Sequence, residues 1–409
     1  MLASLLPIAA LLSLTAQAAE PPKDPLLEQR RSNLPKTLPW PTSFFQPQIA
    51  VPGAPRSTFR LAAPGKRTLS AATLAEAEAY AAEQKSTALL IYQGGELQHM
   101  WFAPGTNADT ISHTYNMQYT PLVLLVGIAM AEGKIKSLDE PASRYLPEWR
   151  NDSRSKITIR NLLQQNAGLE LRRDAHYSEG LYSRDARAYW GSRTKEVLVR
   201  EYPVLYAPGT VFDYNYIVPE LLSIILERAT GQPYQQYLSR KLWQPLGNKT
   251  AYLWLNRPGG EAHVDAGLFS APTDWLNVGV LLLQEGKWKG RQLVPRSYVR
   301  EMMKPSATNP NFGFMYLGSP FAPVRRMSAD PRVTYVVKSA EPFAADDVAY
   351  IDGYGGQRSY VIPSRQMVVV RIGDVAREWD NSRLVNILLR EPAKRAGGAR
   401  PEGRKEKKS

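Results

Sequence analysis

The chain has 409 residues, of which 44% are hydrophobic and 22% charged, so it can bury a large core and is globular rather than disordered. Cysteine is absent, which excludes disulfides, thiolate metal sites, a cysteine nucleophile and a lipid-anchored cysteine at the N-terminus. The net charge of +13 is uneven, because residues 392–409 hold seven Lys or Arg against Glu402 and Glu406, a net +5.

Residues 1–18 have the pattern of a secretory signal peptide. Residues 2–14 form a largely apolar run, and Ala16 and Ala18 follow at the spacing of a cleavage site. We expect cleavage after Ala18 and a periplasmic or secreted protein. The alternative is a buried N-terminal helix, which the shortness of the run disfavours. No later segment approaches 18 uninterrupted apolar residues, so we expect no transmembrane segment.

The next stretch, residues 19–66, is rich in proline and has little periodicity. Its few anchors are Trp40, Phe44 and Phe45. We expect this segment to wrap over the surface of the main domain and not to fold alone.

The main domain is expected at residues 67–390. It opens with an alanine-rich helix over 70–85. A β-hairpin follows, in which two strand-like runs, 88–92 and 98–102, flank a turn at Gly94-Gly95.

Helical patterns then dominate an insertion at about 104–250, and strand-like runs return near the C-terminus. The runs 360–362 and 367–370 are expected to pair across a turn at 363–366, and the last helix is expected over 382–389. Strands at both ends of the chain with helices between them predict an α/β protein of the α+β type, in which both ends build one antiparallel sheet. Residues 391–409 are expected to be a disordered basic tail.

Many spaced blocks of the sequence keep a fixed order between about residues 86 and 373. The blocks include Gly127-Ile128-Ala129, Glu132-Gly133-Lys134-Ile135, Leu138-Asp139-Glu140-Pro141, Val211-Phe212-Asp213-Tyr214, Glu227-Arg228-Ala229-Thr230-Gly231, Thr273-Asp274-Trp275 and Gly353-Tyr354-Gly355-Gly356-Gln357. In this order they resemble the β-lactamase-related serine hydrolases, which include class C β-lactamases, D-alanyl-D-alanine peptidases, esterases and 6-aminohexanoate-oligomer hydrolases. The resemblance implies a β-lactamase/transpeptidase-like fold: an antiparallel sheet flanked by helices, a mostly helical subdomain, and a ligand pocket between them.

The resemblance also implies a serine nucleophile at the start of a helix and a lysine one turn later that receives its proton. Counting back from Gly127 places these two positions at Asn116 and Tyr119. An amide has no hydroxyl with which to form an acyl ester, and a phenol with an ordinary pKa of about 10 is a poor base. Pro121 is a further departure, and we expect it to disturb the helix just after this motif.

The second family motif, Tyr-x-Asn or Tyr-x-Ser, keeps Tyr214 as the candidate proton relay but has Tyr216 in its third place. Tyr214 is either a relic of that relay or an aromatic packed before the helix 218–230. The third motif corresponds to Tyr354, Gly355 and Gly356, where the glycines allow a ligand near the strand or simply form a turn.

A relocated nucleophile is the next alternative. Formal Ser-x-x-Lys matches begin at Ser153 and Ser192, but both lie in polar surroundings and outside the motif order. Ser112 lies one helical turn before Asn116, but Tyr115 and not a lysine stands three residues after it.

Other chemistries have less support. The four histidines are scattered without zinc-ligand spacing, and no Gly-x-Ser-x-Gly elbow, phosphate-binding loop or nucleic-acid motif is present. We therefore expect no metal, no cofactor and no nucleic-acid partner. A basic tail of this kind either keeps the chain soluble or contacts an anionic membrane or cell-wall polymer.

Two functions follow from these observations. The first is an exported relative of the serine hydrolases that has lost its nucleophile and binds a peptide, an amide or a cell-wall fragment in the cleft. The alternative is an active ester or amide hydrolase with a non-standard site around Ser112, Tyr119 and Tyr214.

Overall fold

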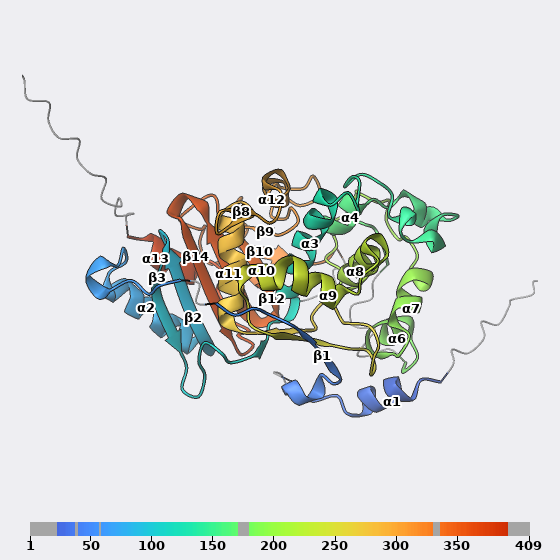
Figure 1. Ribbon diagram of the computed structural model, residues 1–409, viewed down its shortest axis with the longest axis horizontal. Helices are drawn as coiled ribbons and strands as arrows, with labels where there is room; N and C mark the ends of the chain where they lie inside the picture. The colour runs from blue at the N-terminus through green and yellow to red at the C-terminus, as the bar shows by residue number, and fades with distance from the viewer. Residues whose placement is uncertain (1–22, 37–39, 57–58, 171–179, 330–335, 392–409) are drawn as a thin grey trace, which may run out of the picture.

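The computed structural model describes residues 23–36, 40–56, 59–170, 180–329 and 336–391. The signal peptide, residues 1–18, and the tail from 392 onward lie outside them. In Figure 1 a sheet with its covering helices occupies one side of the molecule and a mostly helical region the other. No helix formed by the described residues is both long and apolar enough to cross a membrane.

The described helices and strands have the following bounds. The helices are α1 (Pro25–Ser32), α2 (Ala71–Glu83), α3 (Tyr119–Ala131), α4 (Ile159–Leu163), α6 (Arg184–Trp190), α7 (Thr194–Glu201), α8 (Ile217–Thr230), α9 (Tyr234–Leu238), α10 (Gln244–Leu246), α11 (Pro272–Leu283), α12 (Arg296–Met302) and α13 (Arg383–Leu389). The strands are β1 (Gln48–Val51), β2 (Ser86–Gln93), β3 (Glu96–Phe102), β4 (Ser112–His113), β5 (Ala251–Trp254), β6 (Leu268–Ser270), β7 (Lys287–Trp288), β8 (Arg291–Gln292), β9 (Tyr316–Leu317), β10 (Val324–Arg326), β11 (Val336–Lys338), β12 (Ala349–Gly353), β13 (Gln357–Ile362) and β14 (Met367–Gly373).

The main sheet joins the two ends of the chain, as the sequence predicts. Its strand order is β3-β2-β14-β13-β12-β9, and every neighbouring pair is antiparallel. β14 and β2 are neighbours in the sheet although they are far apart in the sequence, and Val369 lies opposite Ile91. The two expected hairpins, β2–β3 and β13–β14, are both confirmed.

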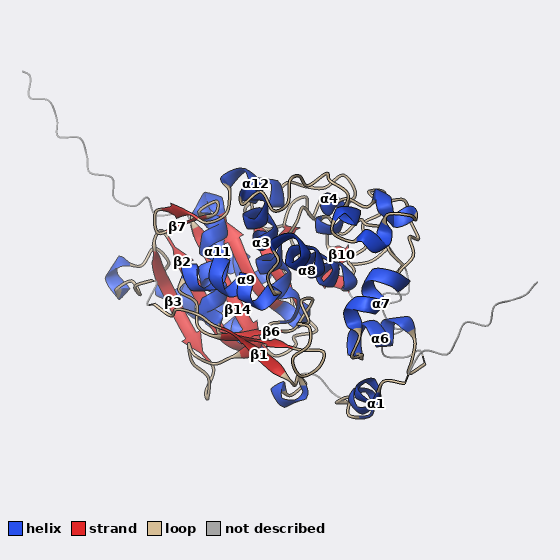
Figure 2. Cartoon of the chain, turned by 45° about the vertical axis from the view of Figure 1, so that its right-hand side comes forward, coloured by secondary structure: helices blue, strands red, loops and turns tan. Residues whose placement is uncertain are grey.

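Helices cover both faces of this sheet. Ser359 of β13 donates a hydrogen bond to the carbonyl of Trp275 in α11 at 3.4 Å, and the next residue, Tyr360, donates to the carbonyl of Asn381, just before α13, at 2.8 Å. Because consecutive strand residues point to opposite faces, α11 covers one face, and α13, which packs against α2, covers the other. Figure 2 shows α11 lying across β14.

The helical region packs around α3 and α8. The predicted apolar positions of α8, namely Val218, Leu221, Leu222 and Ile225, are all buried, which confirms the amphipathic pattern. α8 ends at Gly231, whose left-handed φ of 68° suits glycine.

The prediction that Pro121 disturbs the helix after it is wrong. Pro121 lies in the first turn of α3, where its missing N–H needs no partner, and the helix runs on to Ala131. The irregular part precedes the proline, because Tyr115–Gln118 form a 3-10 turn.

The N-terminal segment supplies the edge strand β1 of a second, four-stranded sheet of order β1-β5-β6-β4. Trp40, Phe44 and Phe45 pack into an aromatic cluster with Trp190 and Trp254. Helix α1 was not expected in this proline-rich stretch. Asp24 caps it by accepting the N–H of Leu27 at 3.2 Å.

Candidate functional site

Three of the residues singled out from the sequence, Asn116, Tyr216 and Tyr354, line a cavity of about 450 Å³. Its walls come from the turn after β4, the N-terminal segment, helix α6, the residue before α8, the loop before β6 and the turn after β12. The lining residues are Pro35, Lys36, Trp40, Phe45, His113, Tyr115, Asn116, Tyr189, Tyr216, Asp265, Ala266 and Tyr354. This volume lies in the range of small-molecule sites, and six of the lining side chains are tyrosine, tryptophan or phenylalanine.

Asn116 lies in the 3-10 turn at the wall of this cavity. Its Nδ2 donates a hydrogen bond to Oδ1 of Asp265 at 2.9 Å, and Asp265 is almost wholly buried. The preceding residue, Tyr115, has a φ of 51°, a left-handed conformation that costs a bulky residue energy. The turn therefore holds an amide beside a carboxylate.

Tyr119 lies at the first residue of α3 and is not among the lining residues. Its phenol donates to the carbonyl oxygen of Leu163 at 2.7 Å, which ties α3 to the end of α4. Burial raises the pKa of Tyr119 far above its usual range, so the phenol is neutral at physiological pH. A neutral phenol that already donates its proton is not poised to accept one from residue 116.

The two tyrosines of the second motif lie apart from each other. The ring of Tyr214 is 6.3 Å from that of Tyr119, and burial raises its pKa well above the ordinary value. Tyr216 lines the cavity, where its ring meets Tyr189 edge-on at 5.4 Å. The cavity thus includes Tyr216 of this pair, and Tyr214 lies in the core behind it.

The third motif divides between two hollows. Tyr354 lines the aromatic cavity, with its ring 5.7 Å from that of Tyr115. Gly355 and Gly356 line a neighbouring hollow of about 470 Å³, which shares only Tyr354 with the first in their described linings. Gly355 has a φ of 75°, and an added Cβ would lie 2.8 Å from Val375. These glycines are therefore required by the turn itself.

The alternative nucleophiles are placed elsewhere. Ser112 lies in β4, opposite Ser270 of β6, and is not among the residues that line the cavity. Ser192 donates to the Asp24 carboxylate at 2.9 Å, and Lys195 forms an ion pair with Glu227. Its formal Ser-x-x-Lys match therefore consists of groups with structural partners.

Sequence reasoning missed two polar residues of the cavity, His113 and Asp265. His113 Nε2 donates to the carbonyl of Ala266, and burial lowers the pKa of His113 to about 4, so the ring is neutral. Its Nδ1 is enclosed without a hydrogen-bond partner among the described residues. His113 directly follows Ser112, and Asp265 precedes a family block, but only the fold brings the two stretches together.

A metal centre has no ligand set in the part of the chain that the structure describes, because no three His, Asp or Glu residues there gather into a cluster. In the described lining, Lys36 supplies the only amine. It is exposed and comes from the N-terminal segment, not from the helix that follows Asn116. The arrangement can enclose an apolar or aromatic ligand and bond to it through an amide, a carboxylate and phenols.

The comparisons with known proteins agree on one family. The sequence profile of the beta-lactamase family matches residues 72–373. The chain is 30% identical to a putative D-alanyl-D-alanine carboxypeptidase of Escherichia coli K12 over 129 residues, covering 29% of this chain and 28% of that protein. It is 22% identical to the 6-aminohexanoate-dimer hydrolase of Paenarthrobacter ureafaciens over 228 residues, covering 54% of this chain and 58% of that protein.

These matches cover less than two thirds of the length of either relative. Among solved structures, a putative 6-aminohexanoate-dimer hydrolase from Bacillus anthracis superposes with a TM-score of 0.64 at 19% identity, covering 83% of this chain and 88% of that one. A likeness at this identity concerns the fold. The profile match spans well over half of the sequence, and the chain belongs to the beta-lactamase family.

Proposed function

We propose that this protein is a catalytically degenerate member of its family that binds a peptide, an amide or a cell-wall fragment in the aromatic cavity. The observation that carries the proposal is the pair of groups at Asn116 and Tyr119. The first is an amide that donates to Asp265, and the second is a buried phenol that donates to Leu163. Neither supplies the hydroxyl or the amine of the family mechanism.

The rest of the cavity supports a binding role. It is lined mainly by aromatic side chains, which offer a large contact area with few rotatable bonds, and by Asn116 and Asp265 as hydrogen-bonding groups. The relatives named above are described as a putative D-alanyl-D-alanine carboxypeptidase and a 6-aminohexanoate-dimer hydrolase, and the compounds in both names contain an amide bond, which favours ligands of that kind.

The degenerate site is tested with covalent probes. The purified protein is incubated with a fluorophosphonate and with a penicillin, and the intact mass is measured. We expect no added mass on the native chain, and labelling at residue 116 in the double variant Asn116→Ser/Tyr119→Lys. The single variant Asn116→Ser, which restores a hydroxyl without the amine, is the matched control and should label far more slowly.

One outcome would overturn this part of the proposal. A stoichiometric adduct on the native chain, above all one that maps to Ser112, would show an active hydrolase with a non-standard site. The adduct would be localised by digestion and mass spectrometry, and Ser112→Ala should then abolish it.

The binding role needs its own measurement. A D-alanyl-D-alanine peptide, a linear 6-aminohexanoate amide and soluble cell-wall fragments are titrated into the protein by calorimetry. At least one should bind, and Trp40→Ala and Tyr216→Ala should each weaken it about tenfold, because each removes an aromatic wall of the cavity. If none of the three binds, the binding role is wrong.

We also propose that the protein acts outside the cytoplasm. The apolar run at residues 2–14 and the small residues before position 19 support this placement. After expression in a Gram-negative host, the periplasmic fraction should contain a chain whose N-terminal residue is Ala19. A cytoplasmic chain that retains residues 1–18 would contradict it.

A further inference from the structure

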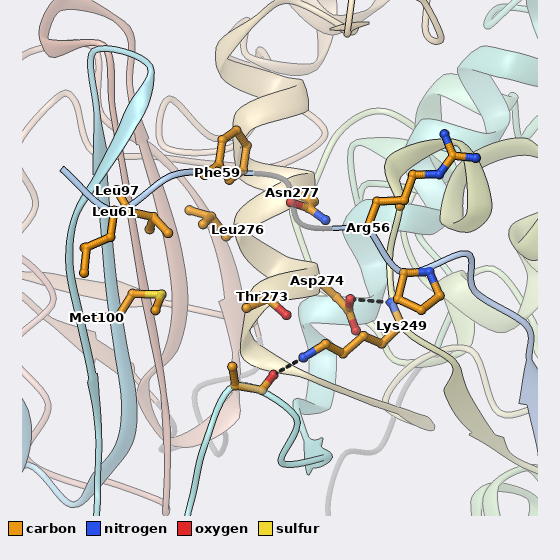
Figure 3. Close-up of a pocket in the computed structure, with 13 residues that line it drawn as sticks. Arg56, Phe59, Leu61, Leu97, Met100, Lys249, Thr273, Asp274, Leu276 and Asn277 are labelled. Carbon is orange, nitrogen blue, oxygen red and sulfur yellow. Dashed lines mark hydrogen bonds between the residues drawn. The ribbon is translucent and has the colours of Figure 1, made fainter.

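A third cavity is lined by the N-terminal segment, the edge of the main sheet and the start of α11. Its volume is about 360 Å³, and its described lining shares no residue with that of the aromatic cavity. Its walls come from residues 55–56 and 59–61, from β3, the edge strand of the main sheet, and from the start of α11 (Figure 3).

The lining of this cavity is divided into an apolar and a polar part. Phe59, Leu61, Leu97, Met100 and Leu276 gather on one side in Figure 3. Leu61 and Met100 are 42% and 37% exposed, so their apolar surface is accessible to a ligand in the cavity. A ligand with an alkyl chain would cover them and gain free energy from the apolar area removed from water.

The polar part offers hydrogen-bond donors. The Lys249 ammonium donates to the carbonyl of Ala108 and pairs with Asp109, which occupies two of its three N–H groups. The hydroxyl of Thr273 is enclosed and has no hydrogen-bond partner among the described residues, although it lines the cavity. An enclosed hydroxyl without a partner costs free energy, which a ligand group that reaches it would recover.

The carboxylate of Asp274 is already engaged by the fold. One of its oxygens accepts the backbone N–H of Lys249 at 2.9 Å and the other accepts that of Ala271 at 3.1 Å. Burial raises the pKa of Asp274 to about 7, so its negative charge is weakened near neutral pH. Lys249 and the exposed Arg56 are the basic residues of the described lining, and the Lys249 ammonium is the one that lies beside Thr273 and Asp274 in Figure 3.

We propose that this cavity binds the carboxylate end of a medium-length alkyl chain, a fatty-acid-like ligand. The carboxylate accepts from the Thr273 hydroxyl and the remaining N–H of Lys249, and the chain lies against Leu61, Met100 and Leu276. This inference stands independently of the role proposed for the aromatic cavity.

The test uses octanoate, with octylamine and octanol as ligands of equal chain length. Titration calorimetry on the full chain should show octanoate binding at least tenfold more tightly than octylamine. Thr273→Val and Lys249→Met should each weaken octanoate severalfold, and Lys249→Met should leave octanol unchanged, because only the charged headgroup loses its partner.

A bulky substitution in the lining tests whether octanoate binds in this cavity or elsewhere on the protein. Met100→Trp should weaken octanoate at least tenfold, whereas Leu205→Trp, at an exposed leucine in the helical region, should have no effect. Circular dichroism and the unfolding midpoint confirm that each variant is folded. If octanoate and octylamine bind equally, or if Trp40→Ala abolishes octanoate binding while Met100→Trp does not, the proposal is overturned.

Discussion

Glu220 shows how strongly a single enclosed residue can couple this fold to pH. Its carboxylate accepts the backbone N–H groups of Val264, at 2.7 Å, and Asp265, at 3.0 Å, next to the aromatic cavity. Burial nevertheless raises its pKa from 4.5 to about 8. The folded state therefore holds a proton on Glu220 at pH values where the unfolded chain has released it.

The sign of the effect follows from this difference. The stability that the folded state gains by binding this proton is fully present below pH 4.5 and is lost as the pH rises through 8. Between these values the free energy of unfolding falls by up to about 1.4 kcal/mol per pH unit for one proton. Glu220→Gln should flatten the decline in the free energy of unfolding between pH 5 and pH 8, measured by urea titration. Glu196→Gln, at an exposed position, is the control. Equal declines in the native chain and Glu220→Gln would contradict the assignment.

The sequence identifies some residues of the candidate site and cannot reach others. Asn116, Tyr216 and Tyr354 are found by their places in ordered blocks, and all three line the cavity. His113 and Asp265 carry no local signal, because their proximity depends on the pairing of β4 with β6. Periodicity reports burial along one element and not contacts between distant ones.

Among the secondary-structure elements, α1 is the clearest case of tertiary contacts deciding local structure. Arg30 donates to the carbonyls of Trp190 and Leu255, both at 3.0 Å, and its guanidinium lies 5.0 Å from the centre of the Trp254 ring. Burial lowers the pKa of Arg30 to about 10, so it still carries its charge at neutral pH. These contacts hold α1 on the second sheet.

Arg30→Met should release α1 from this position. The variant keeps most of the aliphatic volume but leaves two enclosed carbonyls without donors, which costs about 1–3 kcal/mol for each group. Limited proteolysis should cut the N-terminal segment several times faster than in the native chain, with the main domain still protected. Gln29→Met, at an exposed position of the same helix, is the control. Uniform degradation of the whole chain would instead mean that the segment is not a separately released unit.

Elements with strong local signals are predicted well. The β2–β3 and β13–β14 hairpins follow from apolar runs beside turn residues, and α2 and α8 follow from helical periodicity. The Asp24 cap is a local signal for helix α1, but the contacts that hold the helix in place, from Arg30 to Trp190 and from Ser192 to Asp24, join distant parts of the chain and could not be predicted. Short strands such as β4 were missed because a strand of two residues is too short to show an alternation of apolar and polar side chains.

At the scale of the whole molecule, the charge is distributed unevenly. Residues 392–409 carry +5 of the net +13, so a chain that ends at Glu391 has +8. Removing them should weaken binding to vesicles that contain anionic lipid, and the loss should shrink as salt is raised, because screening shortens the reach of surface charges. Co-sedimentation at two salt concentrations measures this. If the full-length chain and the chain that ends at Glu391 sediment with the vesicles to the same extent, the tail does not contact anionic surfaces.

The hydrogen bond from Tyr119 to Leu163 would make the proposed loss of catalysis hard to reverse. A lysine at this position would place an ammonium where the structure encloses a phenol, and the Leu163 carbonyl would have to accept from a charged group in a tightly packed site. Regaining the hydroxyl at residue 116 alone would bring no catalysis, and regaining the amine alone would lower stability. We therefore expect the path back to a hydrolase to pass through a less fit intermediate, so that natural selection would retain the side chain that now stabilises the fold.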